Sequence, residues 1–349
     1  MNYLILTTII VLISIELLLL NNSKKIGNVI SLIDIPDGIR KFHKTSVPLV
    51  GGLILCVVIF LNSISFIFLN INYLKFEIIL FLVFLTIFGL IDDKYNLNAN
   101  FKFLFLIIFF TIFFLINSEL AVSKLRFSSF RFELNFYDYI IIPFTVLSSL
   151  LLINSINMID GKNGLCASIQ IIILIFLTFY IFKHQYHANG ILNFYEDELV
   201  FIYLYFLYLC FFLIFNIKGK VFLGDSGAYL GSFIIIYLIL NIYSKNLFLN
   251  CEQIFFLLMV PGIDMLRVFL IRILNKKNPF KADTEHLHHL IGRKFTSHLK
   301  ITMVISLALL IPNLLINIFP KFTLVILFFS LSIYILSIKK LYNYENKKI

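Results

Sequence analysis

The chain has 349 residues, of which 60% are hydrophobic and only 14% are charged, whereas a soluble domain carries roughly 25% charged residues. This composition excludes a disordered protein and an ordinary soluble domain. The net charge of +10 would indicate a nucleic-acid partner in a soluble protein, but in a membrane protein it first indicates orientation.

Eleven apolar runs follow one another along the chain, most of them near the roughly 20 residues that a transmembrane helix needs. Because no basic segment precedes the first run, we expect a first span and not a cleaved signal peptide. The sequence therefore predicts an all-α, polytopic integral membrane protein with about 11 transmembrane helices and one membrane-embedded domain, residues 1–349. The runs fall at about 3–20, 50–69, 76–91 (which is short), 101–117, 139–156, 165–182, 199–215, 227–243, 253–273, 301–318 and 322–338.

The basic residues predict how these spans are oriented. Alternate loops and the C-terminal tail, with Lys102, Arg267 and Arg272 counted among them, hold 22 of the 29 Lys and Arg residues. The positive-inside rule makes that side cytoplasmic. We therefore expect the N-terminus outside, the C-terminus in the cytoplasm and no nucleic-acid partner.

The first of five polar clusters on the predicted cytoplasmic side is basic. Lys41, His43 and Lys44 precede Gly51-Gly52, where an apolar run begins. Cationic side chains next to backbone N–H groups at a helix start suit a phosphate group. A solvated loop that obeys the positive-inside rule would show the same residues.

The second cluster is a pair of carboxylates, Asp92-Asp93, directly after the run 76–91. Two adjacent carboxylates at a membrane edge are costly unless they are solvated, paired or bound to a metal ion. The pair could hold Mg²⁺ or act as a base, or it could simply end a helix.

The third cluster contains Asn157, Asp160 and Asn163 together with two glycines, immediately after an apolar run. Asn and Asp tolerate turn conformations, so a plain tight turn is one interpretation. The other is a backbone shaped to approach a polar ligand.

The fourth cluster begins at Asn216 and ends in Gly224-Asp225-Ser226-Gly227. Asp225 could bind a metal ion, and its glycine neighbours would let a phosphate approach closely. Asp225 or Ser226 could also cap the next helix, and both roles can coexist.

The fifth cluster contains His286, His288 and His289, followed by Arg293. A zinc site would need a fourth ligand, and no Cys is near. A loop rich in cations and hydrogen-bond donors fits a phosphate or a sugar better. Histidines lying at the membrane interface without a function are the remaining interpretation.

Together the clusters favour chemistry on a nucleotide diphosphate. Mg²⁺ is commonly held by one or two carboxylates and by substrate phosphates, and a metal ion with nearby cations suits reaction at phosphorus. The sequence has no P-loop, which argues against an ATPase.

Over about residues 30–300 the five clusters, in this order, resemble the motifs of bacterial polyprenyl-phosphate N-acetylhexosamine-1-phosphate transferases (glycosyltransferase family 4). The resemblance implies transfer of an N-acetylhexosamine 1-phosphate, GlcNAc-1-phosphate before other sugars, from a UDP-sugar to undecaprenyl phosphate, with release of UMP. It also implies an active site on the cytoplasmic side of the bacterial inner membrane, a role in starting a cell-envelope polysaccharide such as O-antigen, and a homodimer as one option.

The same resemblance implies a role for each motif. Mg²⁺, or alternatively Mn²⁺, is expected on Asp225, and Asp92 or Asp93 is expected to orient or deprotonate the lipid phosphate or to add a metal contact. Substrate contacts are expected from Lys41, His43, Lys44, Asn157, Asp160, Asn163, Asn216, His286, His288, His289 and Arg293.

Two other classes stay open. A membrane prenyltransferase also binds diphosphates through Asp and Mg²⁺, but its carboxylates are usually spaced as DxxxD, whereas Lys94-Tyr95-Asn96 follows Asp93. A non-enzymatic transporter would place polar residues at the bilayer midplane, whereas the clusters lie at one edge of the predicted spans.

Overall fold

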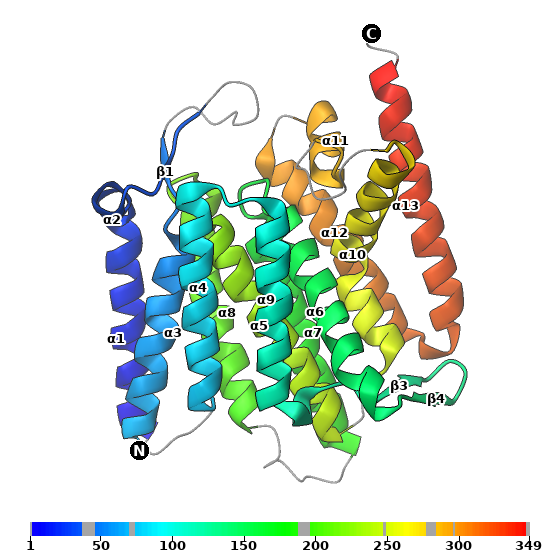
Figure 1. The fold of residues 1–349 in the computed structure, drawn as a ribbon, viewed down its shortest axis with the longest axis horizontal. Coiled ribbons are helices and arrows are strands. Elements are labelled where there is room, and N and C mark those ends of the chain that lie inside the picture. Colours follow the sequence, from blue (N-terminus) through cyan, green and yellow to red (C-terminus); the bar gives the residue numbers. More distant parts are fainter. Residues whose placement is uncertain are drawn as a thin grey trace. The chain divides into compact units, whose positions relative to one another are not determined.

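A computed structural model describes residues 2–36, 46–69, 74–187, 196–246, 249–276, 284–295 and 297–346 (Figure 1). Ten helices within these ranges are long and apolar enough to cross a membrane. They coincide with ten of the eleven predicted runs, so the predicted all-α polytopic fold is confirmed. These helices are α1 (Asn2–Asn21), α3 (Gly51–Phe68), α5 (Ala99–Ile116), α6 (Asp138–Ile159), α7 (Leu165–His187), α8 (Glu196–Ile217), α9 (Gly224–Asn246), α10 (Cys251–Leu274), α12 (His298–Ile318) and α13 (Thr323–Asn346).

The eleventh predicted run forms α4 (Phe76–Tyr95), a helix of 20 residues. It differs from the other ten in carrying more than two charged residues in every 18-residue stretch, because Glu77 lies near its start and Asp92, Asp93 and Lys94 lie near its end. Two of these charged residues, Asp92 and Asp93, are the ones that the sequence singles out for chemistry.

The short elements lie between the long helices. The helices α2 (Ser23–Ile30) and α11 (Leu287–Lys294) each have 8 residues, and single 3₁₀ turns cover Ser118–Leu120 and Pro320–Phe322. Two antiparallel hairpins, which the apolar runs do not predict, pair β1 (Ile33–Asp34) with β2 (Val47–Pro48) and β3 (Lys124–Phe127) with β4 (Phe132–Asn135).

The helices cluster into two compact units. Unit 1 comprises Met1–Leu97 and Ile181–Ile234, and unit 2 comprises Asn98–Tyr180 and Ile235–Ile349. In unit 1, α1 packs against α3 and α8, and α3 packs against α4. In unit 2, α10 packs against α6 and α12, while α11 contacts α12 and α13.

Packing inside each unit depends on shape and on hydrogen bonds. Lipid tails are as apolar as leucine, so helices in a bilayer gain little from the hydrophobic effect and associate through close contact and polar pairs. Phe66 is buried in unit 1 and Phe113 in unit 2. The Asn313 amide donates to the Phe256 carbonyl oxygen over 2.8 Å and so joins α12 to α10.

Large apolar side chains also lie on the outside of both units. Leu6 and Ile10 on α1 are exposed, as are Phe328 and Leu336 on α13. Apolar exposure on this scale is unusual in a soluble protein, but it is the normal surface of a helix that faces lipid. The chain is a multi-span membrane protein.

Candidate active site

The site in unit 1 begins where α3 starts. The N–H groups of Gly51 and Gly52 donate to the carbonyl oxygens of Phe222 and Leu223 over 2.9 and 3.0 Å. Because the first N–H groups of a helix have no partner within it, this pairing ties the start of α3 to the segment that leads into α9. Lys41, His43 and Lys44, predicted to hold phosphate, lie outside the described residues.

Three glycines bring α3, α4 and α9 into backbone contact. A Cβ atom on Gly52 would lie 2.1 Å from the nitrogen of Gly227, and one on Gly89 would lie 2.3 Å from the Cα of Ser226. Small residues permit this approach between membrane helices. The first turn of α9 is therefore held directly against the start of α3 and the last turns of α4.

Asp93 caps α9 from the neighbouring helix. Its carboxylate accepts hydrogen bonds from the N–H groups of Asp225 and Ser226 over 2.7 and 3.1 Å. A carboxylate is favourable here because it satisfies unpaired N–H groups and faces the positive end of the helix dipole. The structure gives Asp93 a capping role, and its catalytic role stays a prediction.

Asp92 is 1% exposed and reaches the next turn of α9. One carboxylate oxygen accepts the Leu97 N–H over 3.1 Å, and the other accepts the Tyr229 hydroxyl over 3.3 Å. Asp92 therefore fixes the chain just after α4 and touches α9 as well. Its predicted role in catalysis stays a prediction.

Asp225 lies in the first turn of α9, and its side chain is partly exposed. The Asp93 carboxylate accepts a hydrogen bond from the backbone N–H of Asp225. The contacts between α4 and α9 therefore bring Asp92, Asp93 and Asp225 close together. The predicted substrate residue Asn216 donates instead to the Val221 carbonyl oxygen over 2.8 Å. In this position Asn216 closes the loop between α8 and α9.

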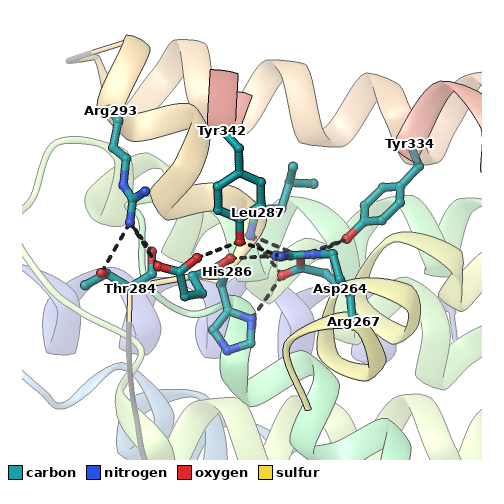
Figure 2. Close-up of polar contacts among 9 residues, drawn as sticks. Asp264, Arg267, Thr284, His286, Leu287, Arg293, Tyr334 and Tyr342 are labelled. Atoms are coloured by element: carbon teal, nitrogen blue, oxygen red, sulfur yellow. Dashed lines mark hydrogen bonds and ion pairs between the residues drawn. The ribbon is translucent and has the colours of Figure 1, made fainter. Parts of the chain in front are cut away.

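The site in unit 2 is built on Asp264, which lies within α10. Both of its oxygens accept the Leu287 N–H, over 3.1 and 3.0 Å, and one lies 3.0 Å from Nδ1 of His286 (Figure 2). Leu287 is the first residue of α11, so Asp264 caps this helix from α10 and orients the imidazole beside it.

Arg267 and two tyrosines complete this network (Figure 2). The Arg267 guanidinium donates to Asp264 over 2.8 Å and to the Tyr334 hydroxyl over 3.0 Å. The Tyr334 hydroxyl donates in turn to Asp264 over 2.9 Å. Arg267 also donates to the hydroxyl of Tyr342 over 3.2 Å, so α13 is tied to α10 at two points.

The segment before α11 is fixed by its own contacts. The Tyr342 hydroxyl donates to the Glu285 carboxylate over 2.6 Å. Arg293 donates to the Thr284 carbonyl oxygen over 3.1 Å and to the Glu285 carboxylate over 3.4 Å. Arg293 is the predicted sugar-phosphate ligand, and its contacts in this structure hold the segment that leads to the histidines.

His288 joins the histidine motif to the third cluster. Its side chain is buried, and a Cβ atom on Gly161 would lie 2.2 Å from its Nε2 atom. Burial, with smaller contributions from His289 and His286, lowers the pKa of His288 well below its usual value. The ring is therefore neutral near pH 7, while burial also lowers the pKa of Lys162 nearby.

The loop after α6 carries the remaining predicted residues. The Asp160 N–H donates to the Asn157 carbonyl oxygen over 3.1 Å, which ends the helix. Asn163 accepts the Thr302 hydroxyl over 3.0 Å and donates its N–H to His298 over 3.3 Å. Unit 2 thus brings the third and fifth clusters together at Gly161 and His288, although the predicted contacts of Asn157, Asp160, Asn163 and His289 with substrate stay predictions.

Comparison with known proteins supports one family. Residues 75–243, just under half of the chain, match the model of glycosyl transferase family 4, a range that includes Asp92, Asp93 and Asp225. The chain is a phosphotransferase enzyme.

Curated relatives match most of the length of this enzyme. It is 29% identical over 287 residues to a probable undecaprenyl-phosphate N-acetylglucosaminyl 1-phosphate transferase of Bacillus subtilis (strain 168), covering 81% of this chain and 76% of the relative. It is 24% identical to an undecaprenyl-phosphate alpha-N-acetylglucosaminyl 1-phosphate transferase of Yersinia pestis (83% and 77% coverage) and 23% identical to the one of Escherichia coli (strain K12) (84% and 78% coverage).

The carboxylates of unit 1 suit a metal ion that would be shared with substrate. Among the residues that the structure describes, no three His, Cys, Asp or Glu side chains are placed to hold a metal by themselves. Mg²⁺ commonly takes one or two protein carboxylates and completes its shell with water and substrate phosphates. The partly exposed Asp225 carboxylate suits that arrangement.

The sequence analysis missed Asp264 and the tyrosines of α13. Asp264 lies inside the apolar run 253–273, and Arg267, three residues later, was counted only as a sign of orientation. An ionisable residue inside a span is costly and usually has a partner. An Asp–Arg pair at this helical spacing was therefore a signal that could have revealed the network, whereas Tyr334 and Tyr342 had none.

Proposed function

We propose that this enzyme transfers an N-acetylhexosamine 1-phosphate, with GlcNAc-1-phosphate as the first choice, from a UDP-sugar to undecaprenyl phosphate. The observation that carries the proposal is the meeting of Asp92, Asp93 and Asp225 at the first turns of α9. The names of the relatives supply the acceptor and the sugar. The product would start a cell-envelope polysaccharide such as O-antigen, made at the cytoplasmic face of the inner membrane.

In the proposed reaction, an oxygen of the lipid phosphate attacks the sugar-linked phosphorus of the UDP-sugar. The bond from that phosphorus to the bridging oxygen breaks, and UMP leaves with that oxygen. A metal ion on Asp225 would neutralise the diphosphate and stabilise the leaving UMP. Because Asp93 holds the first turn of α9, the Asp225 carboxylate has a fixed position for this task.

The third and fifth clusters are proposed to supply further substrate contacts. Burial lowers the pKa of His288, so its ring is neutral. A neutral ring can donate or accept a hydrogen bond without adding charge to the site. Arg293 supplies a fixed cation beside the histidine motif for the sugar phosphate. Asn157, Asp160 and Asn163 are proposed to contact the nucleotide, and Asn216 is proposed to act through the loop that it closes.

A panel of UDP-sugars tests this proposal. Purified protein in detergent is mixed with undecaprenyl phosphate and UDP-GlcNAc, UDP-GalNAc or other UDP-sugars, with Mg²⁺, with Mn²⁺ or with a chelator. We expect UMP release and a lipid diphospho-sugar, fastest with UDP-GlcNAc, and neither product with the chelator. Release of pyrophosphate from a polyprenyl diphosphate would favour a prenyltransferase, and movement of solute without turnover would favour a transporter.

A further inference from the structure

An apolar slot runs between α10, α11, α12 and α13, all of which belong to unit 2. Its volume is about 590 Å³, and 16 of its 21 lining residues are apolar. On α13 the lining side chains run from Ile326 to Leu341, which at the rise of an α-helix is about 22 Å. The slot is therefore long, and it lies along membrane-spanning helices.

The chemistry of the lining limits what can occupy the slot. An extended peptide is excluded, because unpaired backbone groups are not tolerated against lipid. A hydrocarbon chain has no polar groups to pair and matches a lining that is apolar apart from Lys294, Ser330, Tyr334, Ser337 and Lys340.

The two charged lining residues, Lys294 and Lys340, lie toward one end of the slot. Lys294 ends α11, just before α12 begins, and Lys340 lies near the end of α13. Because α12 and α13 run antiparallel across the turn at Pro320–Phe322, the start of α12 and the end of α13 lie at the same end of the slot. Both lysine side chains are exposed there, and basic residues beside an opening between spans attract anionic lipid head groups.

We propose that the slot binds one chain of an anionic phospholipid, with Lys294 and Lys340 on its phosphate. The acceptor lipid fits less well, because its phosphate must react and the lining contains no carboxylate or histidine. The proposal requires only that the protein spans a membrane, and it does not depend on which sugar nucleotide the enzyme uses. Because Tyr334 and Leu287 line the slot and also bond to Asp264, the bound lipid stabilises the cap that holds the histidine motif.

The test uses full-length protein and two lipids that differ in charge, phosphatidylglycerol and phosphatidylcholine. Binding is followed by native mass spectrometry and by competition with a fluorescent phosphatidylglycerol. We expect wild type to prefer phosphatidylglycerol and to unfold at a higher temperature when it is present. The paired variant Lys294→Gln with Lys340→Gln should bind it about 30-fold more weakly and bind phosphatidylcholine unchanged.

Two further variants separate the slot from general surface charge. Ser330→Phe, which puts a ring into the slot, should weaken binding of both lipids. Lys339→Gln, next to Lys340 but not on the slot, should change neither. Wild type without a preference, or a loss with Lys339→Gln as large as with the pair, would overturn the proposal. Displacement of phosphatidylglycerol by equimolar undecaprenyl phosphate would also overturn it, in favour of an acceptor site.

Discussion

Two carboxylates in this enzyme, those of Asp93 and Asp264, each cap the start of a neighbouring helix. Asp93 on α4 accepts the first-turn N–H groups of α9, and Asp264 on α10 accepts the first N–H of α11. In each case a carboxylate from one helix caps another helix that carries a functional motif. The capped helices bear Asp225 in unit 1 and His288 in unit 2.

The two caps differ in how their charge is balanced. The contacts of Asp264 include the guanidinium of Arg267, the hydroxyl of Tyr334 and the ring of His286. The contacts of Asp93 include two backbone N–H groups, and the carboxylate of Asp92 precedes it in the chain. The charge-paired Asp264 cap, whose charge is balanced by Arg267, is suited to stabilising the fold around α11. The Asp93 cap lies beside other carboxylates and is suited to a site that binds a cation.

The largest effect on activity should come from removing the carboxylate of Asp225, which lies in the helix turn that Asp93 caps. Asp93 accepts the backbone N–H of Asp225, so Asp225→Ala leaves the cap in place and removes only the side chain. Because metal stabilisation of charge at phosphorus is worth several kcal/mol, we expect UMP release to fall by about 10³-fold or more. The assay compares the initial rates of UMP release by the variant and by wild type, after a thermal unfolding experiment has shown that the two proteins have the same midpoint.

The control for this variant is Asp138→Ala, which removes an acidic side chain from the first turn of a different helix, α6. Its rate of UMP release should stay close to that of wild type. Full activity of a well-folded Asp225→Ala protein would show that Asp225 does not hold the metal ion.

Breaking the charge-paired cap should have the next largest effect, and on stability first. Asp264→Ala leaves the mostly buried Arg267 without its carboxylate, and such a loss costs about 3–5 kcal/mol. We expect a clearly lower unfolding midpoint in detergent and reduced activity. Asp264→Asn, which keeps one acceptor oxygen for the Leu287 N–H, should recover part of the midpoint; if it does not, capping of α11 is unimportant.

The comparison also marks what could be predicted from the sequence. Ten of the eleven expected spans follow from apolar runs in the chain, and carboxylates at the ends of such runs mark Asp92, Asp93 and Asp225 as candidate site residues. The capping role of Asp93 does not follow, because the sequence does not say which helix start a carboxylate faces. Tyr334 could not be predicted either, since its partner lies 70 residues away on another helix.

The Asp93 cap itself should be less sensitive than the Asp264 cap. Asp93→Asn keeps one oxygen for the N–H groups of α9 and leaves no cation unpaired, so we expect a loss of about 1–3 kcal/mol in stability. If Asp93 only caps, activity at a temperature where the variant is folded should stay within about tenfold of wild type. A loss as large as that of Asp225→Ala would assign Asp93 to the chemistry as well.

Removing one hydroxyl from the Asp264 network should have a smaller effect than removing its carboxylate. Tyr334→Phe deletes a hydrogen bond to a charged carboxylate, which is worth about 1.5–3 kcal/mol, and Arg267 remains to balance the charge. Tyr180→Phe is the control in the same unit, because its hydroxyl accepts the Asn317 amide and, among the described residues, has no hydrogen bond to the Asp264 network. We expect both variants to unfold at lower temperature. Only the loss from Tyr334→Phe should add to that of Arg267→Lys by less than the sum, because Tyr334 and Arg267 share the Asp264 carboxylate. Independent losses for that pair would mean that Arg267 and Tyr334 stabilise the histidine motif separately, and the charge-paired cap would then not act as one unit.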